Sequence, residues 1–256
     1  MVSLSTREAD IVFRIMGELS NDHDPTVLRC RVGPLLMDLL KAQYLASYIW
    51  DDGSSMFGDR VAFNMADDNL RSYETYFQFR DPMTHLLQQR RRTTSVNEVI
   101  ARPALERSEF YNDFLKKDGL YYGINFYAYS GDSNIGDLRI WRGHGREDFS
   151  RRDIEILDMI GPSFSHAMRL SLARHAASDR SSRIALLTTL EKAARSAGLT
   201  EREKQIAAAL VAGRTDQEIA DACCISVTTV RTHVKHIFRK FGVSSRTRLI
   251  HDITLQ

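Results

Sequence analysis

The sequence has little cysteine and no long apolar run, and both absences exclude classes of protein. Three cysteines in 256 residues are too few for a disulfide framework, and the adjacent Cys223 and Cys224 lack the spacings of a zinc site. With Cys30, we expect them to be ordinary buried or half-buried residues, a redox switch at the adjacent pair being the alternative. No uncharged run approaches the roughly 18 residues of a membrane span, and no basic head precedes an apolar block. We therefore expect a cytoplasmic protein without a membrane partner.

Catalytic groups are lacking as well. No nucleophile and base pair and no cluster of metal-ligating side chains stands out, and His85 and His144 lie in polar surroundings without a convincing partner. An enzyme is therefore the least expected class, and we expect neither a metal nor a cofactor. The apolar content of 43% and the charged content of 27% are those of a globular protein, which at this length has room for two packed cores.

Positive charge is concentrated in the last quarter of the chain. Residues 226–248 contain six basic side chains and no acidic one. A local cationic patch of this kind suits a polyanion, although a solvated basic helix face would have the same composition. The six basic residues are Arg231, Lys235, Arg239, Lys240, Arg246 and Arg248.

Four helical segments with clear starts and stops fill this region. Thr200 with Glu203, and Thr215 with Glu218, have the spacing of a capping box, in which each Thr caps a helix and the Glu reaches back to it. A third helix is expected from a Ser226 cap to a glycine stop at residue 242, and a fourth over residues 245–253.

The third helix is predicted to have two different faces. An apolar stripe at helical spacing should be buried: Val230, Val234, Ile237, Phe238 and Phe241. The opposite face carries hydroxyl and basic side chains. A helix, a short turn and a second helix with such an outer face fit the major groove of duplex DNA.

The candidate DNA-contacting residues divide by chemistry. Arginine and lysine can donate to guanine edges, and threonine can touch a thymine methyl group or a polar edge. Arg239, Lys240 and Arg246, with the helix-capping hydroxyls, are better placed for phosphates. The complete set is Thr215, Thr228, Thr229, Arg231, Thr232, Lys235, Arg239, Lys240 and Arg246.

Residues 199–249 resemble the LuxR-type (GerE or NarL-like) helix-turn-helix family. The family pattern of LTxRE, then GxxxxEIA, then ISxxTVxxHxxxIxxKxxVxSR is matched nearly throughout. In that family side chains of the TVxxHVK segment enter the groove, which implies this role for Arg231, Thr232 and Lys235. The last helix commonly pairs two copies on a dyad. The resemblance therefore implies a homodimeric transcriptional regulator that binds a double-stranded operator.

Two positions depart from the family pattern. Cys223 stands where a leucine is usual, and Cys224 stands where the turn usually has Gly, Asn or Asp. These departures concern the local packing of the turn and leave DNA binding expected.

The rest of the chain mixes helical and strand patterns. Two antiparallel hairpins among helices indicate an α+β fold, with an antiparallel-sheet sensor domain flanked by helices and an all-α four-helix domain after it. We predict domains at 1–176 and 199–256, joined by a linker at 177–198 whose polar segment 178–183 suits a flexible hinge. Helices are expected over 6–20, 26–41 with a kink at 33–34, 67–79, 103–117, 149–177 and 184–197, and strands over 44–50, 60–65, 120–130 and 137–142, with a turn at 51–54.

Residues 10–175 resemble the GAF-like or autoinducer-type ligand domain that precedes LuxR-type DNA-binding domains. The resemblance rests on YxxYFxFRDP at 73–82, on LERSEFYNDFLKKDGL at 105–120 and on the FSRRD helix start at 149–153. It implies a small molecule as a further partner.

In the acyl-homoserine-lactone receptors of that group, an aspartate before a proline accepts a hydrogen bond from the ligand amide, which implies this role for Asp81. Two tryptophans that those receptors use are replaced here by Asp68 and Val96. Their absence argues against a homoserine lactone as the ligand.

Small-molecule sites are mostly apolar with a few polar groups, so aromatic residues are the first candidates for a pocket. Core packing explains any one of these rings at least as well, and Asp81 could equally cap a turn or a helix. The candidate ligand-contacting residues are Tyr48, Phe63, Tyr73, Tyr76, Asp81, Tyr127 and Trp141.

These patterns favour a DNA-binding regulator that responds to a small-molecule signal. A regulator controlled by a protein partner or by dimerisation alone is the first alternative. A sigma-factor-like promoter-binding protein shares the LTxRE start, but it would need a helical polymerase-binding region where strands and turns are expected. A phosphorylation receiver would need alternating strands and helices with acidic residues after the strands.

Overall fold

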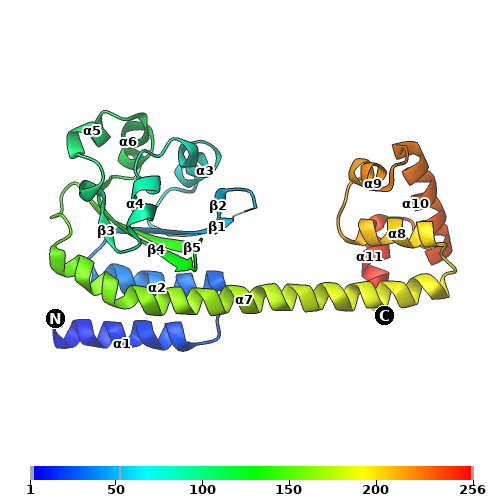
Figure 1. Ribbon diagram of the computed structural model, residues 1–256, viewed down its shortest axis with the longest axis horizontal. Coiled ribbons are helices and arrows are strands. Elements are labelled where there is room, and N and C mark those ends of the chain that lie inside the picture. The colour runs from blue at the N-terminus through cyan, green and yellow to red at the C-terminus, as the bar shows by residue number, and fades with distance from the viewer. Residues whose placement is uncertain (1–2, 52, 255–256) are drawn as a thin grey trace. The chain divides into compact units, whose positions relative to one another are not determined.

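The computed structural model describes residues 3–51 and 53–254. By its internal contacts the chain divides into an N-terminal unit, residues 1–175, and a C-terminal unit, residues 176–256 (Figure 1). The finer division into a sensor domain, a linker and a DNA-binding domain remains a prediction.

The N-terminal unit is built on a five-stranded antiparallel sheet of order β2-β1-β5-β4-β3. Both predicted hairpins are confirmed, and β1 pairs with β5 so that Leu45 faces Ile140. Strand β3 is only two residues long, too short for a pattern to reveal it. The strands are β1 (Tyr44–Asp51), β2 (Met56–Phe63), β3 (Thr94–Ser95), β4 (Leu120–Ser130) and β5 (Ser133–Gly143). Residue 52, within the predicted turn at 51–54, lies outside the described residues.

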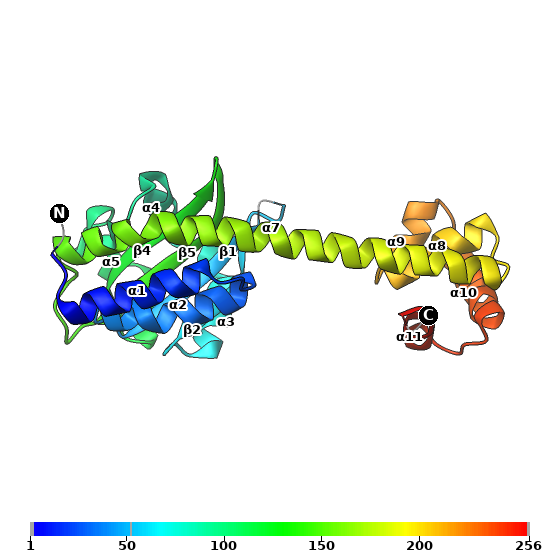
Figure 2. The same ribbon diagram turned by 90° about the horizontal axis from the view of Figure 1, so that it is seen from below.

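One face of the sheet is covered by α1 (Thr6–Ser20), α2 (Pro25–Leu39) and the first part of α7 (Arg151–Ser196), which lie side by side in Figure 2. Helix α2 continues through Pro34 as a single element, so the helix does not restart there, and a kink at 33–34 remains a prediction. A Cβ on Gly33 would lie 2.3 Å from Cε2 of Phe63, so glycine allows α2 to pack closely on β2.

The other face is covered by short helices and 3-10 turns (Figure 1). The single helix predicted over 103–117 is wrong, because Ser108 starts a new helix by accepting a hydrogen bond from the Tyr111 amide at 3.1 Å. A buried aromatic cluster fills the space below these elements. They are α3 (Asp67–Thr75), η1 (Phe77–Phe79), α4 (Thr84–Arg90), η2 (Val96–Glu98), α5 (Arg102–Glu106), α6 (Glu109–Asp113) and η3 (Leu115–Lys117).

Helix α7 also corrects the expectation of a flexible hinge. Residues 178–183 are helical, and the helix expected over 184–197 is the last part of α7. The segment is polar but contains neither glycine nor proline, so nothing in it stops a helix that has already begun. The helix ends just before Gly198, whose φ is +65°.

In the C-terminal unit, four short helices and the end of α7 enclose one apolar core. Both predicted capping boxes are formed, at Thr200 with Glu203 and at Thr215 with Glu218. Gly242 ends the third helix in the left-handed region, with φ of +69°, as predicted. The helices are α8 (Glu201–Val211), α9 (Asp216–Cys223), α10 (Val227–Phe241) and α11 (Arg246–Thr254).

Within the described residues, no helix combines the length and the apolar character needed to cross a membrane. Cys30 and Cys224 are exposed and Cys223 is half-buried, so the expectation of buried or half-buried cysteines is wrong for two of the three.

Candidate nucleic-acid interface and ligand cavity

Helices α9 and α10 form a helix-turn-helix with capped starts. The Thr215 hydroxyl accepts from the Glu218 amide at 3.3 Å at the start of α9, and the Ser226 hydroxyl accepts from the Thr229 amide at 3.1 Å at the start of α10. Between the two helices Cys224 has φ of +53°, in the left-handed region. This conformation is why glycine, asparagine or aspartate is usual in such a turn. Arg202 of α8 donates to the carbonyl of Cys223 and ties the turn to α8.

Helix α10 has the two predicted faces. Val230 and Ile237 are fully buried, while Val234, Phe238 and Phe241 are half-buried against the same core. The opposite face is solvent-exposed, and it carries Thr228, Thr229, Arg231, Thr232, Lys235 and Arg239. The core therefore fixes which face of α10 can meet another molecule.

The exposed side chains of α10 differ in how far they are already engaged. Arg231 pairs with Asp216 of α9 at 3.1 Å, but its side chain is 72% exposed, so this ion pair is weak. The Thr232 hydroxyl donates to a backbone carbonyl of its own helix. The side chains of Lys235 and Arg239 make no hydrogen bond or ion pair within the described part of the chain. Their charges are therefore available to a partner.

Two of the predicted phosphate contacts have internal roles. Nζ of Lys240 donates to the Gly198 carbonyl at 3.0 Å and pairs with Glu203 at 2.6 Å. Arg246 donates to the Leu210 carbonyl at the end of α8 through Nε at 3.1 Å and Nη2 at 2.6 Å, beside the Gly213 amide that donates to the same oxygen at 3.0 Å. Both residues lock neighbouring helices onto α8, and a phosphate contact by either remains a prediction.

Glu203 is the centre of one of these locks. The Lys240 ammonium and the backbone amide of Thr200 hold the pKa of Glu203 at about 2, well below its usual range. A carboxyl whose pKa is lowered in the folded state stabilises the fold above the unfolded-state pKa, and this contribution is lost as the pH falls toward 2. The lock should therefore be intact at neutral pH and weaken below about pH 4.5.

We expect Glu203→Gln to lower the unfolding free energy of the C-terminal unit by about 1–2 kcal/mol at pH 7, because it removes a charge-assisted hydrogen bond. Between pH 5 and pH 2, the unfolding free energy of the variant should also fall less than that of the wild type. Urea unfolding followed by circular dichroism measures both effects. Glu201→Gln is the matched control, because the Glu201 side chain is 86% exposed. Equal losses in the two variants would contradict the lock.

The second candidate site is a cavity in the N-terminal unit, beneath α3 and α6. Four predicted ligand-contacting residues line it: Tyr48, Tyr73, Asp81 and Trp141. Its volume is about 20 Å³, which is room for one water molecule. The remaining lining is mostly apolar, from Ala46, Met65, Leu70, Met83, Phe110, Phe114, Leu115 and Leu120.

The other candidate ligand-contacting residues do not line this cavity. Tyr127 is buried in the same aromatic cluster but is not among the lining residues. Phe63 packs on the opposite face of the sheet, against Gly33 of α2. Tyr76 is 39% exposed, and its hydroxyl donates to Glu109 at 3.0 Å. Sequence spacing cannot separate these rings, because every one of them suits a sheet covered by helices.

Asp81 lines the cavity and also caps a turn. Its Oδ1 accepts from the amides of Met83 at 2.8 Å and Thr84 at 3.0 Å, and its Oδ2 accepts from the Thr84 hydroxyl at 2.6 Å. The capping role is therefore present, and the expected ligand contact remains a prediction.

A buried ion pair beside the cavity was missed in the sequence. Arg139 and Asp137 of β5 have side chains 8% and 0% exposed, and Nε of Arg139 donates to Asp137 Oδ2 at 2.8 Å. The guanidinium also donates to the Tyr73 hydroxyl and lies 4.9 Å from the Tyr48 ring centroid. Burial opposes the charge on Arg139, but Asp137 together with Tyr73, Tyr127 and Asp81 outweighs it, and the pKa of Arg139 lies well above its ordinary value. The pair is therefore ionised inside the fold.

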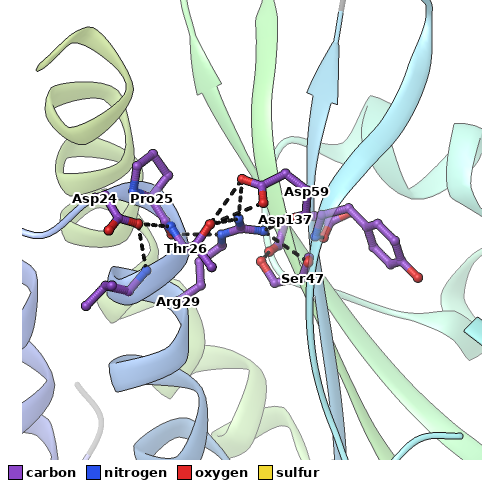
Figure 3. Close-up of polar contacts among 9 residues, drawn as sticks. Asp24, Pro25, Thr26, Arg29, Ser47, Asp59 and Asp137 are labelled. Carbon is purple, nitrogen blue, oxygen red and sulfur yellow. Dashed lines mark hydrogen bonds and ion pairs between the residues drawn. The ribbon is translucent and has the colours of Figure 1, made fainter. Parts of the chain in front are cut away.

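A second buried arginine supports the same region from the opposite face. Figure 3 shows Arg29 of α2, whose side chain is fully buried, reaching Ser47 of β1 and Asp59 of β2. Nη1 of Arg29 donates to the Ser47 carbonyl at 3.1 Å and to the Asp59 carbonyl at 2.6 Å. The β1–β2 register shifts just after Ser47, and a bulge leaves backbone groups outside the ladder that need such a donor.

The Arg29 cluster also holds Asp137 in place. The Ser47 hydroxyl donates to the Asp137 carbonyl at 2.5 Å, and the Tyr48 amide donates to Asp137 Oδ1 at 2.7 Å. Burial raises the pKa of Asp137, while Arg139, the Tyr48 amide and Arg29 oppose that rise. The Asp137 carboxylate therefore pairs with Arg139, and its backbone is linked to the Arg29 cluster through Ser47.

Residues 197–252 match the family described as bacterial regulatory proteins, luxR family. The chain carries a GerE domain of the luxR family. Over 52 residues it is 44% identical to the response regulator protein VraR of Staphylococcus aureus and to that of Staphylococcus saprophyticus. The match covers 20% of this chain and 25% of VraR, so the chain spans about a quarter of the length of these curated relatives. The GerE domain belongs to a family of regulatory proteins, which agrees with the expectation that the chain is not an enzyme.

Outside the GerE domain, the likeness is one of fold. The ligand-binding domain of VqsR from Pseudomonas aeruginosa superposes with a TM-score of 0.50 at 13% identity, covering 66% of this chain and 98% of that chain. The GAF domain of a phosphoenolpyruvate-protein phosphotransferase from Coxiella burnetii gives a TM-score of 0.51 at 13% identity, covering 68% and 99%. The fold implied by the resemblance to GAF-like and autoinducer-type domains is confirmed.

Proposed function

We propose that the chain is a DNA-binding transcriptional regulator in which α10 enters the major groove and the N-terminal unit binds a small-molecule signal. The observation that supports it most is the exposed face of α10. This face presents Lys235 and Arg239 without internal partners, and the buried Val230 and Ile237 on the other side fix its direction.

Some of the candidate residues suit base edges, which determine sequence specificity, and others suit phosphates, which position the protein on the duplex. Arg231, Thr232 and Lys235, in the middle of the exposed face, suit base edges. Thr215, at the cap of α9, and Arg239, toward the end of α10, suit phosphates, together with the hydroxyls of Thr228 and Thr229. Binding would exchange the weak pair of Arg231 with Asp216 for contacts to DNA.

A homodimer on a two-fold operator is part of this proposal. Leu249 and Ile253 of α11 are buried in the core of their own unit, and Ile250 is half-buried. A dimer contact through α11 would therefore use its outer residues, such as Thr247 and His251, which are exposed.

The DNA assignment is tested with the full-length chain and a labelled duplex selected from a random library by the wild-type protein. The double variant Lys235→Ala with Arg239→Ala is expected to bind the duplex about 100-fold more weakly than the wild type. Its affinity should also depend less on salt concentration, by the equivalent of about two phosphate contacts or fewer. Fluorescence anisotropy at several salt concentrations measures both quantities.

The matched control is Arg14→Ala with Arg151→Ala, which removes the same charge from exposed positions in the N-terminal unit. If both double variants bind alike, α10 does not read the duplex. Equal binding would also mean that the cationic face is only a solvated surface.

The alternative of a regulator without a small ligand is supported by one observation, the small volume of the cavity. A thermal-shift screen of the full-length chain against a metabolite set separates the two forms of the proposal. A saturable shift favours a ligand-controlled regulator, whereas no shift favours control by a protein partner or by dimerisation.

A further inference from the structure

Several hydrogen-bond donors around the cavity have no partner within the part of the protein that the structure describes. A guanidinium has five N–H donors. For Arg139, one N–H at Nε points to Asp137 and one at Nη1 points to Tyr73. Nη2 lies 2.8 Å from Asp137 Oδ2 as an ion pair, but it makes no hydrogen bond. Donor capacity therefore remains on Arg139 after the protein's own acceptors are used.

Two other buried lining residues have unpartnered polar atoms. The Tyr48 hydroxyl and the Asn125 amide nitrogen are both buried without a hydrogen-bond partner. The carboxylate that lines the same cavity, Asp81, already accepts three hydrogen bonds from its own turn. A buried donor without a partner costs free energy, so an occupant that supplies acceptor oxygens would remove this cost.

We infer that the small molecule of the proposed function is a compact carboxylic acid with an apolar body, whose carboxylate binds Arg139. This inference rests on the proposed ligand-binding function and narrows its substrate class. A guanidinium and a carboxylate match as planar forks, which makes this pair stronger and more directional than a bond to a neutral carbonyl. The apolar lining from Leu70, Phe110 and Leu115 suits the body of the acid.

The surrounding charges are arranged so that a second carboxylate can approach Arg139. Asp137 pairs with Arg139, and the fully buried Arg29, whose cluster is drawn in Figure 3, donates to the carbonyl of Ser47, whose hydroxyl binds the Asp137 carbonyl. Arg29 has its own partner in Asp59, but the Asp59 side chain is 52% exposed and is therefore screened by water. This region of the sheet thus holds two buried guanidinium groups and one fully buried carboxylate, which pairs with Arg139. Asp81 opposes an added anion, but its hydrogen bonds to Met83 and Thr84 stabilise its own charge.

The cavity must enlarge to accept an acid larger than water. Met65 and Met83 belong to its lining, and methionine side chains adapt their shape readily. The elements above the cavity are short helices and 3-10 turns, which have fewer backbone hydrogen bonds to break than the sheet below them.

The test uses the full-length protein and matched probe pairs: benzoate and benzamide, phenylacetate and phenylacetamide, cinnamate and cinnamamide. Titration calorimetry measures each affinity. At least one acid is expected to bind, and its amide should bind at least 100-fold more weakly. Arg139→Lys should weaken binding of the acid at least 10-fold while leaving Asp137 a cationic partner. Tyr48→Phe should weaken the same acid several-fold without unfolding the protein, since the hydroxyl has no partner to lose.

Three results would overturn the inference: no acid binds, acid and amide bind equally, or Arg139→Lys binds the acid as the wild type does. Far-UV circular dichroism and a urea titration show whether each variant is folded. If neutral compounds from the metabolite set bind and acids do not, the inference fails while the proposed function stands. If neither class binds, ligand sensing fails as well, and DNA binding remains as a separate result.

Discussion

Asp137→Ala is expected to lower the unfolding free energy of the N-terminal unit by about 3–5 kcal/mol, because it leaves a buried guanidinium without its counter-charge. Three contacts are lost together: the ion pair with Arg139 and the hydrogen bonds from Arg139 Nε and the Tyr48 amide. The Ser47 contact survives, because it uses the backbone carbonyl of residue 137. The loss of unfolding free energy therefore measures the contribution of the carboxylate alone.

Urea unfolding followed by tryptophan fluorescence isolates this effect, since Trp50 and Trp141 both belong to the N-terminal unit. Asp132→Ala is the control, because the Asp132 side chain is fully exposed and its pair with Arg91 should be worth less than about 1 kcal/mol. Removing both partners, as Asp137→Ala with Arg139→Met, should recover part of the lost stability. If Asp137→Ala alone has an unfolding free energy within about 1 kcal/mol of the wild type, the ion pair is hydrated and not buried.

Ile237→Ala has the second largest expected effect, a loss of about 2–5 kcal/mol from the C-terminal unit. Ile237 is 0% exposed and packs in the core that α8, α9, α10 and α11 share. Truncation there leaves a cavity in the one apolar core that holds these helices together. Because α10 also carries the proposed DNA-reading face, DNA binding should fall in proportion to the unfolded fraction.

Circular dichroism is the measurement for this variant, because the C-terminal unit contains neither tryptophan nor tyrosine. The tryptophan transition of the N-terminal unit should stay unchanged, which provides an internal control. Thr232→Ala, on the exposed face of the same helix, should change stability by no more than about 0.5 kcal/mol. An equal loss from Thr232→Ala would mean that the two faces of α10 have been assigned wrongly.

Local signals account for the parts of the fold that could be predicted. Helix α10 combines a cap at Ser226, a glycine stop at residue 242 and an apolar stripe, and these three signals agree within one short segment. The hairpins combine β-branched and aromatic runs with turns. The predicted helix over 103–117 failed because its apolar spacing continues across Ser108, where the capping hydroxyl starts a new helix.

The missed features depend on contacts between distant residues. Lys240 and Glu203 are far apart in sequence, as are Arg246 and the Leu210 carbonyl, so no local spacing pairs them. Asp137, Arg139 and Trp141 alternate along β5, a pattern that usually places charged side chains toward water. Here the short helices above the sheet cover that face and turn the charges into a buried ion pair.

Exposed thiols give each unit its own attachment point for a probe. Cys30 lies in α2 of the N-terminal unit, and Cys224 lies in the turn before α10 of the C-terminal unit. With Cys223→Ser to leave one thiol in the turn, maleimide dyes or nitroxide labels would mark one position in each unit without introducing a new cysteine. Energy transfer or dipolar coupling between them would then follow how the units move when DNA or an acid is added.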